Sequence, residues 1–204
     1  MDDRLASARG LKMDKATAST ERVELYSRTA RFFHWSIVAL IVVQAPIGVY
    51  MAYRGNTLKI WDAVTGGLYT SHKLIGVTIL VVVLCRLAYR LTHGTPADEP
   101  TIEPWQKIAS HLNHWGMYVL LLGVPIAGYI GISLYPALDI LGLFSLPGVV
   151  APNREASATA FLVHRLLGRL LVLLIAIHVA AALFHYFIRK DNVLARMLPR
   201  LLRR

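Results

Sequence analysis

The sequence predicts an all-α integral membrane protein, a four-helix antiparallel bundle with both termini in the cytoplasm. Of its 204 residues, 55% are hydrophobic and only 17% are charged, which is too apolar for an ordinary soluble domain of this length. Four apolar segments are each long enough to cross a bilayer as a helix, which takes about 20 residues. The net charge of +10 comes largely from residues that flank these segments, where basic side chains set orientation rather than bind nucleic acid.

The predicted spans cover residues 32–53, 72–91, 112–134 and 161–188. Pro46 and Pro125 lie inside the first and third spans, where proline is tolerated if neighbouring helices satisfy the released carbonyls. The apolar stretch 137–150 contains Pro147 and has about half the length that a span requires. We therefore expect this stretch to be an interfacial loop.

The distribution of lysine and arginine orients the bundle, because these residues accumulate on the cytoplasmic side of a membrane. They are frequent before the first span and after the fourth, whereas the loop 135–160 contains only Arg154. We therefore expect loops 54–71 and 135–160 to lie outside. The predicted organisation is a disordered cytoplasmic tail over 1–24, the bundle over 25–199 and a basic cytoplasmic tail over 200–204.

Histidines within the spans are the most informative polar residues, because a polar ring in the bilayer needs a partner. His164 and His178 are separated by 14 residues, so they share one face of the fourth helix about 21 Å apart. His72 matches the outer depth of His164, and His34 matches the inner depth of His178. Pairing by depth predicts His72 with His164 near the outer face and His34 with His178 near the inner face.

Two isolated histidines at each depth are a poor closed zinc site, which requires four ligands. They suit the two axial positions of a haem, whose porphyrin supplies four further nitrogens. A covalent C-x-x-C-H attachment is excluded because the chain has a single cysteine, Cys85, so we expect two haems of b type. With both axial positions occupied, electron transfer is the expected task.

Other histidines leave alternatives open. His185 follows His178 by one heptad and competes with it as the inner ligand, but it would place the two haems near opposite surfaces. We favour His178, which leaves His185 to bind quinone or to extend toward water. His111 and His114 are three residues apart at the start of the third span, where they can line a quinone pocket, support a haem propionate or bond to water and headgroups.

Basic residues accompany the outer pair of histidines. Lys73 follows His72, Arg165 follows His164, and Arg169 lies about one turn further along the fourth helix. Haem propionates can neutralise these cations, and any remaining charge would attract a small anion. Ordinary extension to the interface is the alternative. Arg86 and Arg90 allow the same two interpretations for the inner side.

Several motifs in the chain resemble those of the bacterial cytochrome b561 family of small dihaem membrane proteins. The resemblance extends over about 26–199 and rests on the segments Arg31–Trp35, Ser71–Gly76, His111–His114, Ala180–His185 and Lys190–Pro199. The last of these is the most specific. The N-terminal tail is longer than is usual in the family, and the loop 135–160 has a composition of its own.

The resemblance implies particular roles for the histidines. The family's four haem ligands match His34, His72, His164 and His178. The superoxide oxidase-like members take electrons from superoxide at the periplasmic face and reduce ubiquinone in the membrane. By this resemblance His185 would lie near the quinone, and the outer basic residues would guide superoxide.

The leading hypothesis is therefore a superoxide:ubiquinone oxidoreductase of the bacterial inner membrane, with two haem b groups and no residue assigned as catalytic. Its expected partners are membrane lipid, quinone, and either superoxide or an electron-donor protein, with no nucleic acid. The alternative is a cytochrome b membrane-anchor subunit that passes electrons from a dehydrogenase or hydrogenase to quinone. A transporter or structural membrane protein whose histidines handle protons or metal is a third possibility.

Overall fold

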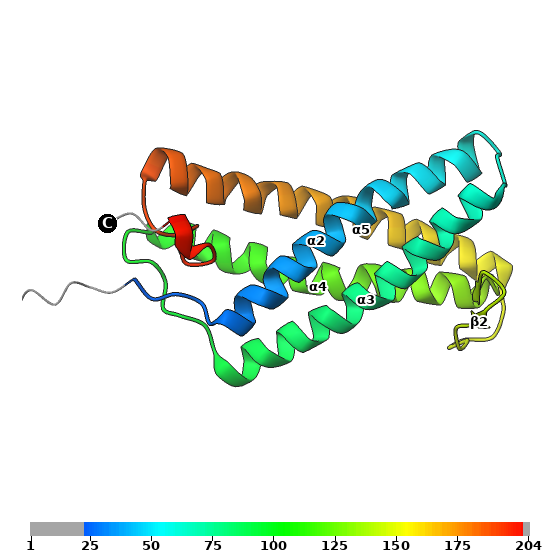
Figure 1. Ribbon diagram of the computed structural model, residues 1–204, viewed down its shortest axis with the longest axis horizontal. Helices are drawn as coiled ribbons and strands as arrows, with labels where there is room; N and C mark the ends of the chain where they lie inside the picture. The colour runs from blue at the N-terminus through cyan, green and yellow to red at the C-terminus, as the bar shows by residue number, and fades with distance from the viewer. Residues whose placement is uncertain (1–22, 202–204) are drawn as a thin grey trace, which may run out of the picture.

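The computed structural model describes residues 23–201, and this part of the chain folds into a bundle of long helices (Figure 1). The helices are α2 (Arg28–Ala52), α3 (Ala63–His93), α4 (Pro104–Leu134) and α5 (Arg154–Phe184). Each is long and apolar enough to cross a membrane, so the predicted four-helix membrane architecture is confirmed for the described residues. The predicted disordered tail falls almost entirely on residues 1–22, outside this range, and so do residues 202–204 of the predicted basic tail.

Helices α2 and α5 each end in a π-helical turn, Tyr53–Thr57 and His185–Arg189 respectively. We call the end of the molecule at which α2 begins the inner end and the opposite end the outer end. Figure 1 shows that α3 and α5 finish or turn back at the inner end, whereas the loops after α2 and α4 lie at the outer end.

The helices extend beyond the predicted spans because polar caps, rather than apolar residues, define where they begin. The Asp62 side chain accepts a hydrogen bond from the Thr65 N–H at 2.9 Å and starts α3 nine residues before His72. Asn153 caps α5 in the same way, ten residues before His164. The predicted outer loops 54–71 and 135–160 are therefore too long, because a hydropathy pattern finds only the part of a helix that crosses hydrocarbon.

The bundle is built from two antiparallel helical pairs. Helix α2 packs along α3, and α4 packs along α5, while α3 and α4 join the two pairs. The buried core at this junction consists of Ile37, Ile79, Val83 and Tyr118. Neither α2 nor α3 makes extensive backbone contact with α5, which leaves room for side chains and a ligand between the pairs.

The apolar stretch 137–150 does not form a fifth span. It contains a two-stranded antiparallel hairpin of β1 (Asp139–Ile140) and β2 (Phe144–Ser145), with Ile140 opposite Phe144. The connecting turn places Leu141 and Gly142 at positive φ, of 53° and 72°. This hairpin covers the outer end beside the start of α5 (Figure 1).

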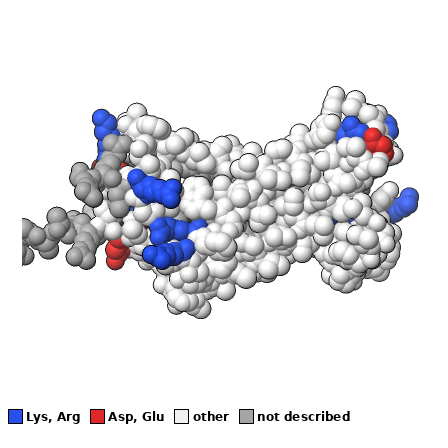
Figure 2. Space-filling view, in the orientation of Figure 1, with Lys and Arg blue, Asp and Glu red and all other residues white. Residues whose placement is uncertain are grey.

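On the face drawn in Figure 2, charged side chains lie at the two ends of the bundle. Figure 2 shows lysine and arginine near both ends and a broad zone without charges between them. A bilayer favours this distribution, because charged groups in hydrocarbon are costly.

Candidate cofactor site between the helices

The outer site is formed by His72 from α3 and His164 from α5. Their ring centroids are 6.0 Å apart and their planes are nearly perpendicular, at 85°. Each ring lies against a glycine of the neighbouring helix. A Cβ atom on Gly48 would come within 2.9 Å of His72 Cε1, and one on Gly128 within 2.9 Å of His164 Nδ1. The two glycines therefore provide the space that the imidazoles occupy.

The orientation of His164 is fixed by α4. Its Nδ1 lies 2.8 Å from the carbonyl oxygen of Val124, which can only accept, so Nδ1 carries the proton and donates. A helical carbonyl points along the axis toward the residue four positions later, which here is Gly128. The missing side chain at Gly128 lets the ring reach this oxygen. The second nitrogen, Nε2, is then free to bind a metal.

His72 is held differently, through the polar residue Gln44 in the middle of α2. Gln44 Nε2 donates to the backbone oxygen of His72 at 2.9 Å. His72 Nδ1 and Gln44 Oε1 are both buried, and neither has a hydrogen-bond partner among residues 23–201. Sequence reasoning missed Gln44, although an uncharged polar residue inside an apolar span was a signal that could have identified it.

The inner site brings together three histidines. The rings of His34 (α2) and His178 (α5) have centroids 6.2 Å apart, and His114 (α4) approaches His178 at 5.2 Å. Ser110 Oγ lies 3.2 Å from His114 Nδ1. His111, predicted on the same helical face as His114, instead points outward and lies 3.2 Å from Asp98 Oδ1. The structure therefore separates the two histidines of this motif.

The spacing of the two histidine pairs fits a haem at each level. Imidazoles that bind one iron from opposite sides have centroids about 6 Å apart, because each metal–nitrogen bond is about 2 Å and the centroid lies about 1 Å behind the nitrogen. Residues 23–201 contain no group of three or more His, Cys, Asp or Glu positioned to hold a metal ion alone. The donor sets thus suit a cofactor that supplies its own equatorial ligands.

His185 lies at the inner end and not at either pair. It opens the π-helical turn after α5, is only 8% exposed, and places Nδ1 2.5 Å from Asp191 Oδ2. Asp191 Oδ1 accepts the N–H of Val193 at 3.1 Å. Lys190, at φ 56°, turns the chain back and brings Asp191 to His185. Sequence reasoning did not find Asp191, because this contact depends on the turn.

The Lys190–Pro199 motif closes the inner end of the bundle. Arg196 is buried and donates from Nε to the backbone oxygen of Glu24 at 2.8 Å, and from Nη2 to that of Ala97. Trp35, next to His34, donates from Nε1 to the Met197 carbonyl at 3.3 Å. The motif, which is the red segment in Figure 1, therefore joins the N-terminal segment, the α3–α4 connection and α2.

The three basic residues predicted near the outer pair differ in environment. Lys73 Nζ donates to the backbone oxygens of Ala137 and Asp139, at 3.1 and 2.5 Å, and so holds the outer hairpin. Arg165 and Arg169 are exposed and have no ion-pair partner within residues 23–201. Two guanidinium charges, one of them at the midpoint of α5, are therefore uncompensated in the described part of the chain.

Four membrane-spanning helices that carry paired histidines at two depths are typical of a membrane cytochrome of the b class. The sequence profile described as prokaryotic cytochrome b561 matches residues 25–200, and the chain belongs to this family. It is thus a bacterial membrane protein of an electron-transfer family that binds b-type haem, as the sequence predicts.

Individual relatives are similar over nearly their whole length. Cytochrome b561 homolog 1 of Escherichia coli (strain K12) is 29% identical over 181 residues, which cover 86% of this chain and 97% of the relative. The probable superoxide oxidase CybB of Yersinia pestis is 26% identical over 171 residues, with coverage of 82% and 92%. Cytochrome b562 of Cereibacter sphaeroides is 29% identical over 175 residues, with coverage of 85% and 94%.

Proposed function

We propose that this protein is a dihaem superoxide:ubiquinone oxidoreductase of the bacterial inner membrane. The observation that carries the proposal is the presence of two histidine pairs, His72–His164 and His34–His178, with ring centroids 6.0 and 6.2 Å apart. The similarity to a relative described as a probable superoxide oxidase supports the proposed direction of the reaction. Two superoxide anions would each lose one electron to form dioxygen, and one ubiquinone would take up two electrons and two protons.

In this proposal the haems, when bound, supply one-electron redox chemistry, and the protein supplies ligands and orientation. His164 presents Nε2 because its Nδ1 is bonded to the Val124 carbonyl at 2.8 Å. If each histidine pair holds a haem, the two imidazoles would leave no open position for dioxygen and would favour outer-sphere electron transfer.

The outer arginines Arg165 and Arg169 would raise the local concentration of superoxide. A small anion is drawn toward uncompensated positive charge, and this attraction increases encounter rates. Lys73 would contribute less to steering, because its ammonium is bonded to the carbonyls of Ala137 and Asp139.

His185 is the residue proposed to bind ubiquinone at the inner end. The Asp191 carboxylate, 2.5 Å from Nδ1, would fix the ring and leave Nε2 free for a quinone oxygen. His111 is a weaker candidate because it is exposed and bonded to Asp98, and His114 lies within the inner histidine group. The basic residues at the inner end support a cytoplasmic location for this site.

Stopped-flow mixing of the oxidised, haem-loaded protein with superoxide tests the proposal. We expect fast haem reduction, followed by reoxidation only when ubiquinone is present. In His185→Ala, haem reduction should persist while the quinone-dependent phase slows. If superoxide does not reduce the haems but a dehydrogenase or hydrogenase does, the protein is a membrane-anchor subunit and the superoxide proposal is wrong.

A further inference from the structure

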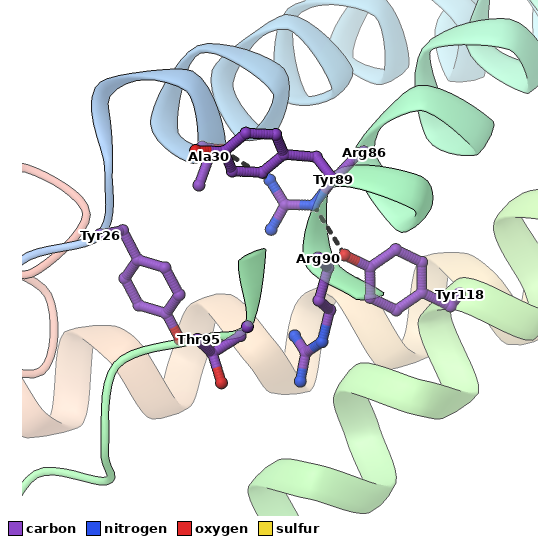
Figure 3. A pocket seen from close by; sticks show the side chains of 8 residues that line it. Tyr26, Ala30, Arg86, Tyr89, Arg90, Thr95 and Tyr118 are labelled. Carbon is purple, nitrogen blue, oxygen red and sulfur yellow. Dashed lines mark hydrogen bonds between the residues drawn. The ribbon is translucent and has the colours of Figure 1, made fainter. Parts of the chain in front are cut away.

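A small cavity at the inner end is distinct from both histidine pairs. It lies among the start of α2, the end of α3 and the middle of α4, and its polar lining comes mainly from Tyr26, Arg86, Arg90, Thr95 and Tyr118 (Figure 3). Tyr26 and Thr95 stand in the segments just before α2 and just after α3. The cavity is therefore at the level where the helices leave the membrane.

Arg86 forms a fixed wall of this cavity. Its Nε donates to the Tyr118 hydroxyl at 3.1 Å, and its Nη1 donates to the Ala30 carbonyl at 3.1 Å, as the dashed lines in Figure 3 show. Tyr118 is itself only 6% exposed. The guanidinium is thus held in place while its Nη2 has no hydrogen-bond partner within residues 23–201.

Arg90 provides a second guanidinium one turn further along α3. Its Cζ stacks on the rings of Trp115 and Tyr118, at 5.3 and 5.7 Å from their centroids. Stacking occupies the face of the guanidinium and leaves its N–H groups at the edge. Among the described residues, the Arg90 guanidinium has no ion-pair partner and no hydrogen-bond partner. The hydroxyl groups of Tyr26 and Thr95 also have no hydrogen-bond partner there.

We infer that this cavity binds a phosphate group, supplied by an anionic phospholipid headgroup or by free phosphate. The lining offers two arginines and two unpaired hydroxyls and no carboxylate, which is the chemistry that recognises an oxyanion. Basic pockets between helices at the cytoplasmic membrane surface are suited to lipid phosphates. This inference does not depend on the proposed redox reaction.

A carboxylate from the inner cofactor is the competing occupant, because the Arg86 charge also acts on His34 and His178. The position of the cavity favours phosphate. Tyr26 and Thr95 lie outside the helices, at the membrane boundary, and no histidine of the described chain lines the cavity.

Thermal unfolding of the haem-loaded protein in zwitterionic detergent tests the inference with three probes at equal ionic strength: inorganic phosphate, phosphatidylglycerol and phosphatidylcholine. A ligand that binds only the folded state raises the melting temperature. We expect phosphatidylglycerol to raise it more than phosphatidylcholine. In Arg90→Gln the apparent affinity should fall about tenfold, the usual effect of losing a charge-assisted hydrogen bond. Arg28→Gln is the matched control, because it removes one exposed arginine at the same end that does not line the cavity.

The probes separate the sources of phosphate. A response to inorganic phosphate alone assigns the site to free phosphate, and a response confined to phosphatidylglycerol assigns it to the headgroup; both support the inference. If the probes raise the melting temperatures of Arg90→Gln and Arg28→Gln equally, the inference is wrong. An altered haem spectrum in Arg90→Gln with an unchanged phosphate response would also overturn it, in favour of a cofactor carboxylate. If Arg90→Gln does not fold, Tyr26→Phe and Thr95→Val provide the same comparison with charge retained.

Discussion

At the outer site, His164 and Gly128 come from different helices but depend on the same small volume. The ring of His164 fills the position where a side chain on residue 128 would begin, with 2.9 Å between the two. A glycine inside a helix normally costs about 0.5–1 kcal/mol relative to alanine. At this position glycine instead allows the imidazole to reach its carbonyl partner, Val124.

This contact reverses the usual effect of a glycine-to-alanine substitution. Gly128→Ala should lower outer haem occupancy and destabilise the protein by about 1–3 kcal/mol through overpacking. Gly168→Ala is the matched control in α5, because a Cβ there meets no atom within 4 Å, and it should be neutral or stabilising. The haem content and the melting temperature of both variants are measured. If Gly128→Ala and Gly168→Ala have the same haem content and melting temperature, the contact at Gly128 has no role.

Each proposed haem depends on its own pair of histidines, so the pairs should be separable by mutation. His164→Ala should remove the outer haem and leave the inner one, whereas His178→Ala should do the reverse. Haem stoichiometry and redox titration of the purified variants measure this. His111→Ala is the control that should retain both haems, since His111 lies outward beside Asp98. Unchanged haem content in His164→Ala would refute the pairing.

At the scale of the elements, the start of α3 is held by a charged cap. Asp62 accepts hydrogen bonds from the Thr65 N–H and hydroxyl and pairs with Arg54 at 2.6 Å. The bond from the Thr65 N–H is the largest cause that lowers the pKa of Asp62, from 3.8 to about 2, followed by the bond from Arg54. Because the Asp62 carboxylate is ionised in the folded protein, it both caps α3 and neutralises Arg54 after the end of α2.

The lowered pKa of Asp62 predicts that acid destabilises the fold at this cap. A carboxyl with a lowered pKa stabilises the fold fully above its unfolded pKa, about 3.9, and loses this contribution as the pH falls toward 2. The melting temperature of the wild type should thus fall more steeply below pH 4 than that of Asp62→Asn, which keeps a neutral cap. The two proteins should differ most at pH 6, and the difference should shrink as the pH falls through about 2. Parallel curves would exclude Asp62 as a contributor.

Parts of the fold and site were predictable because they depend on local pattern. Apolar length alone gives four spans, and the 14-residue separation of His164 and His178 places both on one face of α5. Helix ends were not predictable from hydropathy, because Asp62 and Asn153 set them through hydrogen bonds. The Asp191 contact was missed because it requires a reversal of the chain at Lys190.

For the whole molecule, the distribution of charge decides how an anion would approach. Arg165 and Arg169 lie between the outer end and the midpoint of α5 and are uncompensated within residues 23–201. The face drawn in Figure 2 has no charged side chain in the middle of the bundle. Exposed charges act over about 10 Å at 0.1 M salt and over about 30 Å at 0.01 M. If these arginines guide superoxide, the effect should be strongest in dilute buffer.

The rate of haem reduction by superoxide should therefore fall as ionic strength rises, by about an order of magnitude between 10 and 200 mM salt, because screening removes the electrostatic gain in encounter rate. The double variant Arg165→Gln with Arg169→Gln should start with the lower rate and show a flatter salt response. Lys107→Gln, which removes one charge at the inner end of α4, should leave the slope unchanged. Stopped-flow rates at four salt concentrations measure all three proteins. A charge that guides an anion must act less as salt screens it. If the wild-type rate does not change with salt, the proposed histidine pairs still stand, but superoxide reaches the protein by simple diffusion.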